Sequence, residues 1–69
     1  SLDATYNENN TTVEVSVNAT SDDYENMTAT IEVVTNKDGV ETSVSKTVEG
    51  TQTEVDEAID EIVEKAKEN

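Results

Sequence analysis

The dipeptide Asp38-Gly39 constrains the fold of this chain more than any other feature, because it separates two segments in which apolar and polar residues alternate. Alternation with a period of two is typical of strands that bury one face, and Asp-Gly favours a two-residue type I′ turn between such strands. A two-residue loop pairs Val33 with Val44, so that both lie on one face. A three-residue loop would turn one strand over, so the apolar pattern selects the shorter loop.

The dipeptide Asn9-Asn10 separates two further alternating segments, and the same reasoning predicts a second hairpin with a two-residue loop. Between the two hairpins, we expect residues 20–26 to form a longer connection, with one helical turn that begins at Ser21. The first hairpin also places its apolar residues on one face. Its predicted pairs are Tyr6 with Val13, Ala4 with Val15 and Leu2 with Val17.

The C-terminal segment changes to the 3.6-residue period of an amphipathic helix. Thr51 and Thr53 are both candidates for the N-cap, and Thr51 with Glu54 matches a capping box. Lys65 and Lys67 lie near the other end, where the helix dipole favours positive charge. We expect the apolar stripe of this helix to face the chain's own sheet. The stripe consists of Val55, Ala58, Ile59, Ile62, Val63 and Ala66.

These elements predict an α+β fold: a four-stranded antiparallel β-meander with one C-terminal α-helix packed on its apolar face. One helix, ~10 Å across, is narrower than four strands at ~4.8 Å spacing. Because the helix follows the last strand, we expect the first strand to be least covered, and Tyr24 and Met27 to close the gap if the sheet curls. The apolar residues of that strand are Leu2, Ala4 and Tyr6. The predicted single domain covers residues 1–69, with strands at about 2–7, 11–19, 27–37 and 40–48 and a helix at about 53–67.

The composition excludes several classes of function. The chain has no histidine, cysteine or arginine, and its 17 acids and four lysines give a formal net charge of −13. It therefore lacks the commonest general base, the commonest activated nucleophile and the bidentate ligand of phosphate groups. Nucleic acids and anionic membranes require clustered basic residues. We expect no enzyme, no cofactor, no catalytic or metal-binding residues, no nucleic acid and no membrane partner.

The sequence VTNKDGVETSVS is the nearest approach to a calcium-binding loop. When it is aligned on Gly39, Asn36 and Asp38 occupy the third and fifth ligand positions. The first and twelfth positions, which need acids, hold Val34 and Ser45. Because the flanking segments are predicted strands, we interpret this stretch as a hairpin tip.

Two other local patterns have a simpler explanation than a binding site. The acids of SDDYE offer oxygen ligands to a hard cation, but acids also favour the start of a helical turn, which is our interpretation. These acids are Asp22, Asp23 and Glu25. Four Asn-x-Ser/Thr sequons would suit a glycosylated exported domain, although a chain rich in Asn and Thr produces several by chance. The sequons begin at Asn9, Asn10, Asn18 and Asn26.

The sheet face turned away from the helix is rich in threonine, serine and glutamate. In topology, four strands followed by a helix are similar to the transcriptional coactivator domain that binds single-stranded DNA. That resemblance implies a nucleic-acid surface, which needs aromatic and basic residues that this face lacks. The threonines also resemble an ice-binding surface, but a short sheet twists. We interpret the face as exposed residues of high strand propensity. It contains Glu14, Ser16, Asn18, Thr28, Thr30, Glu32, Ser43, Ser45 and Thr47.

The periodicity, turns, capping and charge placement all agree, which indicates an artificial, computationally designed sequence with no evolved biochemical activity. The alternative is an acidic interaction or surface domain of an exported or halophilic protein. No apolar run has the length of a membrane span and no signal segment opens the chain. We expect a soluble protein, either intracellular or preceded by a leader that is removed. We also expect a monomer without partners, with weak self-association through the first strand as salt screens the charge.

Overall fold

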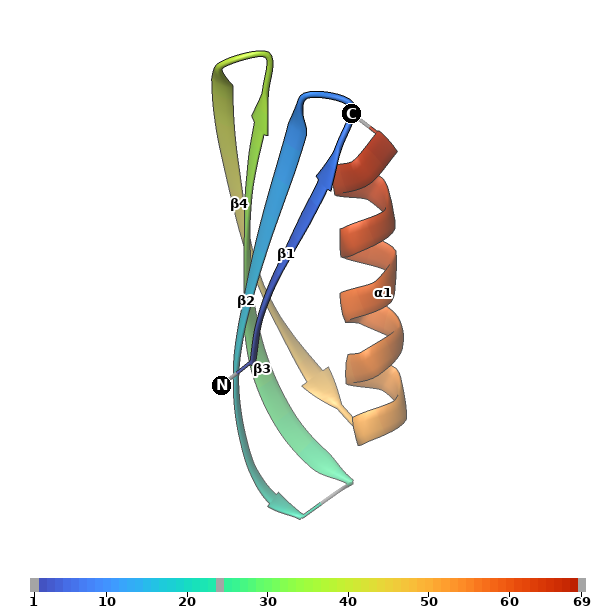
Figure 1. Cartoon of the computed structure of the whole chain (residues 1–69). Coiled ribbons are helices and arrows are strands. Elements are labelled where there is room, and N and C mark those ends of the chain that lie inside the picture. The colour runs from blue at the N-terminus through green and yellow to red at the C-terminus, as the bar shows by residue number, and fades with distance from the viewer. Residues whose placement is uncertain (1, 24, 69) are drawn as a thin grey trace.

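The computed structural model describes residues 2–23 and 25–68, without the side chains of Leu2 and Asp22 (Figure 1). Its strands form one antiparallel sheet in the order β1-β2-β3-β4, and the helix α1 packs on one face of this sheet. The predicted α+β fold, a four-stranded meander with a C-terminal helix, is confirmed. The elements are β1 (Leu2–Glu8), β2 (Thr11–Asp23), β3 (Asn26–Lys37), β4 (Val40–Gly50) and α1 (Gln52–Glu68).

Both predicted two-residue turns are present. The φ angles are 49° and 60° at Asn9 and Asn10, and 52° and 84° at Asp38 and Gly39. Positive φ at both central residues is the requirement of a type I′ turn, whose twist matches that of the flanking strands. The predicted registers are therefore confirmed in both hairpins. They pair Leu2 with Val17, Ala4 with Val15, Tyr6 with Val13, Val33 with Val44 and Ala29 with Val48.

The connection between the hairpins differs from the prediction of a long loop with a helical turn at Ser21, which is wrong. Strand β2 continues to Asp23 instead of ending near residue 19, and β3 begins at Asn26. The Asp23 Oδ1 atom accepts hydrogen bonds from the N–H groups of Glu25 (2.9 Å) and Asn26 (3.0 Å). An aspartate that binds backbone groups two and three residues ahead closes a tight turn without glycine. Tyr24, which we expected to help close the core, lies outside the described residues.

The helix begins at the predicted capping box. Thr51 Oγ1 accepts a hydrogen bond from the Glu54 N–H at 3.2 Å, and Glu54 Oε1 accepts one from the Thr51 N–H at 3.0 Å. Two hydrogen bonds lower the pKa of Glu54 below its ordinary value. The larger effect comes from the Thr51 backbone and the smaller from the Thr51 side chain. A Cβ atom at Gly50 would lie 2.9 Å from Glu54 Oε1. Glycine at this junction therefore leaves room for the capping carboxylate.

The core lies between α1 and the two central strands. Partly buried side chains surround it, and Met27 is among those that pack against it. Thr35 is the buried polar residue among the described side chains. The buried core residues are Val13, Val15 and Val17 of β2, Ala29, Ile31 and Val33 of β3, and Val55 and Val63 of α1.

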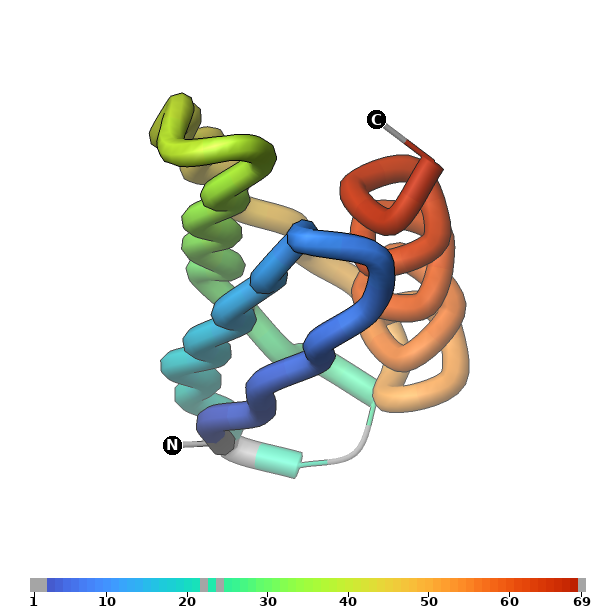
Figure 2. Tube along the Cα trace, turned by 45° about the horizontal axis from the view of Figure 1, so that its top comes forward, coloured from blue at the N-terminus to red at the C-terminus, as the bar shows by residue number. Residues whose placement is uncertain are grey.

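The sheet is strongly coiled, and the molecule measures 40 × 15 × 15 Å. The helix contacts β2, β3 and β4, which are the strands predicted to lie beneath it. The β1–β2 turn approaches the C-terminal end of α1, whereas the β3–β4 turn points away from the helix (Figure 2). The right-handed twist between neighbouring strands accumulates across the sheet, so its two ends cannot face a single straight helix equally.

The helix contacts agree with the prediction that the first strand is the least covered, because among the described residues the backbone of α1 lies against β2, β3 and β4 and not against β1. The exposure of single side chains does not follow that order. Tyr6 on β1 is 38% exposed and Ala4 is half-buried, whereas Val40 and Val44 on β4 are 66% and 60% exposed. The twist brings the β1–β2 turn towards the end of α1 and carries the β3–β4 turn away from the helix, so that Val40 and Val44 lie beyond its cover (Figure 2). The side chain of Leu2 lies outside the described part of the chain. Among the described side chains, the most exposed large apolar residues therefore lie at the edge of the sheet opposite the one expected.

Candidate functional site

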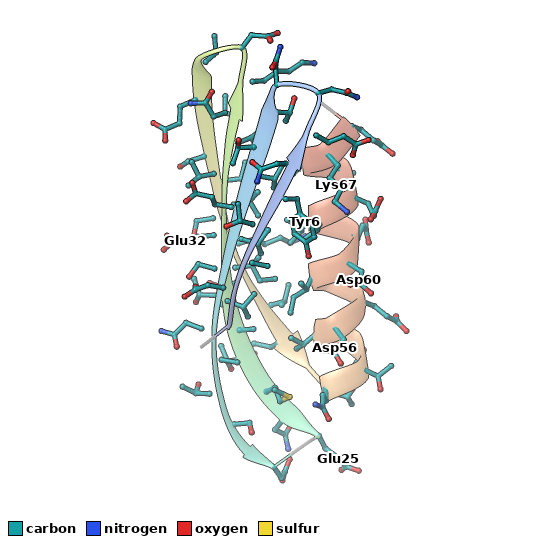
Figure 3. The ribbon with its side chains drawn as sticks, viewed as in Figure 1. Tyr6, Glu25, Glu32, Asp56, Asp60 and Lys67 are labelled. Atoms are coloured by element: carbon teal, nitrogen blue, oxygen red, sulfur yellow. The ribbon has the colours of Figure 1, made fainter. Side chains whose placement is uncertain are left out.

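Two surface hollows flank the C-terminal half of α1. The first has a volume of about 520 Å³ and lies between the β1–β2 turn and the end of the helix. Tyr6 and Lys67 face each other there (Figure 3), with the Lys67 Nζ atom 4.3 Å from the centre of the Tyr6 ring. The same ammonium group lies 3.6 Å from Glu64 Oε1. Lys67 therefore covers the ring through a cation–π contact, and an adjacent carboxylate partly offsets its charge.

The charges that line this first hollow balance each other. Lys37 and Lys67 contribute two cations, and Glu8 and Glu68 contribute two anions. A pocket for phosphate or carboxylate groups needs an excess of positive charge, which these residues do not provide. The hollow consequently supports no assignment to an anionic ligand, and the role of Lys67 that the geometry supports is to cover Tyr6.

The second hollow is an apolar groove of about 250 Å³ between α1 and the second hairpin. Val33 and Thr35 of β3 are buried at its floor, and the exposed Val44 forms its outer side. Val40 continues the exposed apolar surface towards the β3–β4 turn. This groove lies along the free edge of the sheet, where β4 has β3 as its neighbour. Its full lining is Val33, Thr35, Thr42, Val44, Ile62, Lys65 and Ala66.

The sequence placed the residues of this groove on the correct face but did not indicate their exposure. Val40, Val44 and Val48 share the apolar face of β4, as the register requires, and Val48 packs against the core. Thr42 and Lys46 alternate with them on that face. A polar residue at every second inward position is the available signal that this strand extends beyond the cover of the helix. The sequence alone predicts β4 as a strand with a weaker apolar face and does not predict the exposure of that face.

The residues of the candidate calcium loop lie at the tip of the second hairpin and are used by the turn. The Asn36 Oδ1 atom accepts a hydrogen bond from the Gly39 N–H at 3.2 Å, and Asp38 occupies the first central position. Within residues 2–23 and 25–68, no group of three acidic side chains is placed to hold a metal ion. In the other acidic segment, the Asp23 carboxylate closes the β2–β3 turn. The side chain of Asp22 lies outside the described residues.

The face opposite the helix presents the predicted row of polar side chains, including Glu32, which points away from α1 (Figure 3). The hydroxyl groups of Thr30 and Thr47, which are cross-strand partners, lie 3.4 Å apart. The sequon asparagines also lie at the surface, two in the first turn and two on strands. These are Asn9, Asn10, Asn18 and Asn26, and all four are exposed.

Comparison of the chain with models of protein families, with curated proteins and with solved structures found no match. Within the described part of the chain, α1 lacks the length and apolar character of a membrane-crossing helix. Any function therefore has to be inferred from this chain's own residues, above all from those of the apolar groove beside β4.

Proposed function

We propose that this chain is an artificial sequence, designed to specify a stable ββββα fold, and that it has no evolved biochemical activity. The observation that carries the proposal is the agreement between local sequence signals and tertiary structure. Both type I′ turns produce registers in which the apolar faces coincide, and the capping box forms both of its hydrogen bonds. Evolved proteins usually break one or two local rules where function is located.

The composition supports the absence of an enzymatic role. Without histidine, cysteine or arginine, the chain has lysine, tyrosine and carboxylates for acid–base chemistry. In the hollow beside β1, these groups serve to cover the sheet: the Lys67 ammonium lies over Tyr6 and next to Glu64. A general base must lie within hydrogen-bonding reach of a substrate proton, at a pKa near the working pH. We therefore propose neither a catalytic residue nor a cofactor.

Thermal unfolding at low and at molar salt, followed by circular dichroism, tests this proposal. A designed fold should unfold cooperatively well above room temperature in dilute buffer. Salt should raise the midpoint, because the Debye length falls from ~10 Å at 0.1 M to ~3 Å at 1 M and the −13 charge is screened. A chain that is unfolded in dilute buffer and folds only in molar salt would favour a halophilic domain instead.

The second candidate function is that of an acidic interaction domain. The observation that favours it is the exposure of Val40 and Val44 beside an apolar groove. Exposed apolar surface bordered by polar residues often marks an interaction site. A natural domain of this kind would keep the groove as its binding surface, whereas a designed fold would have it only as a consequence of its geometry.

We also propose that the protein is a monomer, because a net charge of −13 repels a second copy at low salt. Sedimentation at two salt concentrations tests this. A monomer in dilute buffer, with any association growing as salt is added, is the expected result. Any such association should involve β4 rather than β1, since its valines are the more exposed. A dimer in dilute buffer that persists on dilution would contradict the proposal.

A further inference from the structure

We propose that the free edge of β4 is a docking site for an extended cationic peptide, which alternates basic and apolar residues and adds a fifth strand to the sheet. This inference goes beyond the proposed function and does not depend on it, because it concerns the surface of the fold whatever its origin. Three observations carry it: the backbone groups at the edge, the apolar strip on the inner face and the acids on the outer face.

The register determines which backbone groups of β4 face outward. Lys37 and Val40 flank the two-residue turn and are paired, so alternate residues from Val40 onward direct their N–H and C=O groups to β3. The intervening residues, Glu41, Ser43 and Ser45, direct theirs to the free edge. Such a row is the template that extended peptides use when they add a strand to a sheet.

The uncovered apolar strip is too narrow for a helix. In the rows that contain Val44 and Thr42, the β3 partners Val33 and Thr35 are only 3% and 9% exposed. The uncovered width is therefore that of one strand, ~4.8 Å, which is about half the ~10 Å diameter of a helix. A neighbouring strand fits this geometry, because its inward side chains would contact Val40 and Val44 directly across the ladder.

The acidic side chains on the outer face of the sheet favour a positively charged added strand. Among the outward side chains in the first half of β4, Glu41 is acidic, and Ser43 and Ser45 are neutral. In the adjacent strand, Glu32 pairs with Ser45. Opposite charges across a ladder stabilise it, so basic residues are favoured at the outer positions of the added strand. The net charge of −13 also attracts a cationic peptide and repels a second copy of the chain.

Lys46 limits the length of the docking site. It follows the outward-facing Ser45 and lies on the same face as Val44, where an inward lysine on an edge strand disfavours pairing. The site therefore covers the first half of β4, residues 40–45, and Ser43 lies near its centre. A substitution at Ser43 is consequently the most direct test of backbone pairing.

The probe is a fluorescent peptide of about nine residues, the length of an ordinary strand, in which lysine and valine alternate. Its binding is followed by fluorescence anisotropy at low salt. Ser43→Pro removes an outward N–H and leaves the ladder with β3 intact, since proline is tolerated on edge strands. The matched control is Thr5→Pro, because the register of the first hairpin places Thr5 in the equivalent outward position on β1. We expect Ser43→Pro to weaken binding about tenfold and Thr5→Pro to leave it unchanged.

A second pair of variants changes the side chains and leaves the backbone alone. Val44→Lys places a cation on the exposed apolar strip, and Thr5→Lys adds the same charge at the other edge. Both positions tolerate the change because they face water. We expect Val44→Lys to weaken binding by about tenfold and Thr5→Lys by no more than about twofold, the latter through net charge alone. Circular dichroism of each variant establishes that it is folded.

Two results would overturn the proposal. A peptide of the same composition, with its lysines and valines in separate blocks, should bind much more weakly. If it binds equally well, and the β4 variants bind like the controls, then the attraction is one of charge without strand addition. If the protein instead dimerises in dilute buffer and Ser43→Pro abolishes the dimer, then the occupant of this edge is a second copy of the chain.

Discussion

The two hairpins of this protein have the same local design and different surroundings. Each has a two-residue type I′ turn, and each pairs its apolar residues on one face. In the first hairpin, Lys67 of the helix lies over Tyr6. In the second, Val40 and Val44 remain more exposed than Tyr6. Local pattern therefore decides which face a side chain occupies, but not whether that face is covered.

The difference arises from the path of the helix. Because α1 begins directly after β4, its first turn lies beside the end of that strand, near the row that pairs Met27 with Gly50. Its last turn lies beside the β1–β2 turn, where Lys67 contacts Tyr6. The helix thus crosses the sheet diagonally and leaves the corner at the β3–β4 turn uncovered (Figure 1). A single helix on a coiled sheet has to leave one corner open.

The largest expected effect compares two valines that are cross-strand partners in the second hairpin, Val33 and Val44. Val33→Ala should lower the free energy of unfolding by about 2–3 kcal/mol, because it removes buried carbon atoms and leaves a cavity. Val44→Ala should lower it by no more than about 0.5 kcal/mol, because the side chain is exposed. Urea denaturation measures both. Equal losses would mean that the groove beside β4 is closed in solution.

Substitutions in the two turns should change the free energy of unfolding by smaller and unequal amounts. Gly39→Ala should lower the free energy of unfolding by about 1–2 kcal/mol, because a φ of 84° is unfavourable for a residue with a Cβ atom. No atom lies within 4 Å of that Cβ position, so the cost comes from the backbone alone. Asn10→Gly in the first turn should be neutral or stabilising by a few tenths of a kcal/mol, since asparagine already has a positive φ there. A loss of stability in Asn10→Gly would show that the asparagine side chain itself supports the first turn.

The contact between Lys67 and Tyr6, which distinguishes the first hairpin, should contribute modestly to stability. Lys67→Met keeps most of the side-chain length and removes the cation above Tyr6, so it should lower stability by about 0.5–1 kcal/mol. Lys46→Met is the control for net charge, because Lys46 is an exposed cation of β4. Thermal unfolding of both variants in the same buffer gives the difference. If the two losses are equal, the effect is one of total charge and the first hairpin gains nothing specific from Lys67.

The smallest effect concerns the junction between the second hairpin and the helix. The folded pKa of Glu54 lies below the ordinary value of 4.5, so its ionised form stabilises the protein above pH 4.5 and this contribution is lost as the pH falls through the folded pKa. Glu54→Gln retains an acceptor for the Thr51 N–H but does not titrate. The stability of the wild type relative to Glu54→Gln should therefore decrease below pH 4.5. A difference that is independent of pH between 3 and 7 would contradict the charged form of the cap.

Much of the fold was predictable because short-range chemistry determines it. Asp38-Gly39 and Asn9-Asn10 set the loop lengths, and a loop length sets the register of every pair in its hairpin. Thr51 and Glu54 meet because they are three residues apart at the start of a helix. The turn after β2 has no such signal in the sequence. Glycine is the usual sequence signal of a tight turn. Here the Asp23 carboxylate stabilises the turn instead, by accepting hydrogen bonds from two backbone N–H groups.

Local sequence signals therefore specify the elements, the hairpin registers, the helix cap and the face on which each apolar side chain lies. They also place Val40 and Val44 on the inner face of the sheet. Which edge of that face remains open depends on how the helix packs on the assembled sheet. The direction in which α1 crosses the sheet depends on the summed twist of four strands and on packing against residues far apart in the chain. No short sequence segment specifies the total twist of the sheet, so the exposed groove beside β4 cannot be predicted from local patterns.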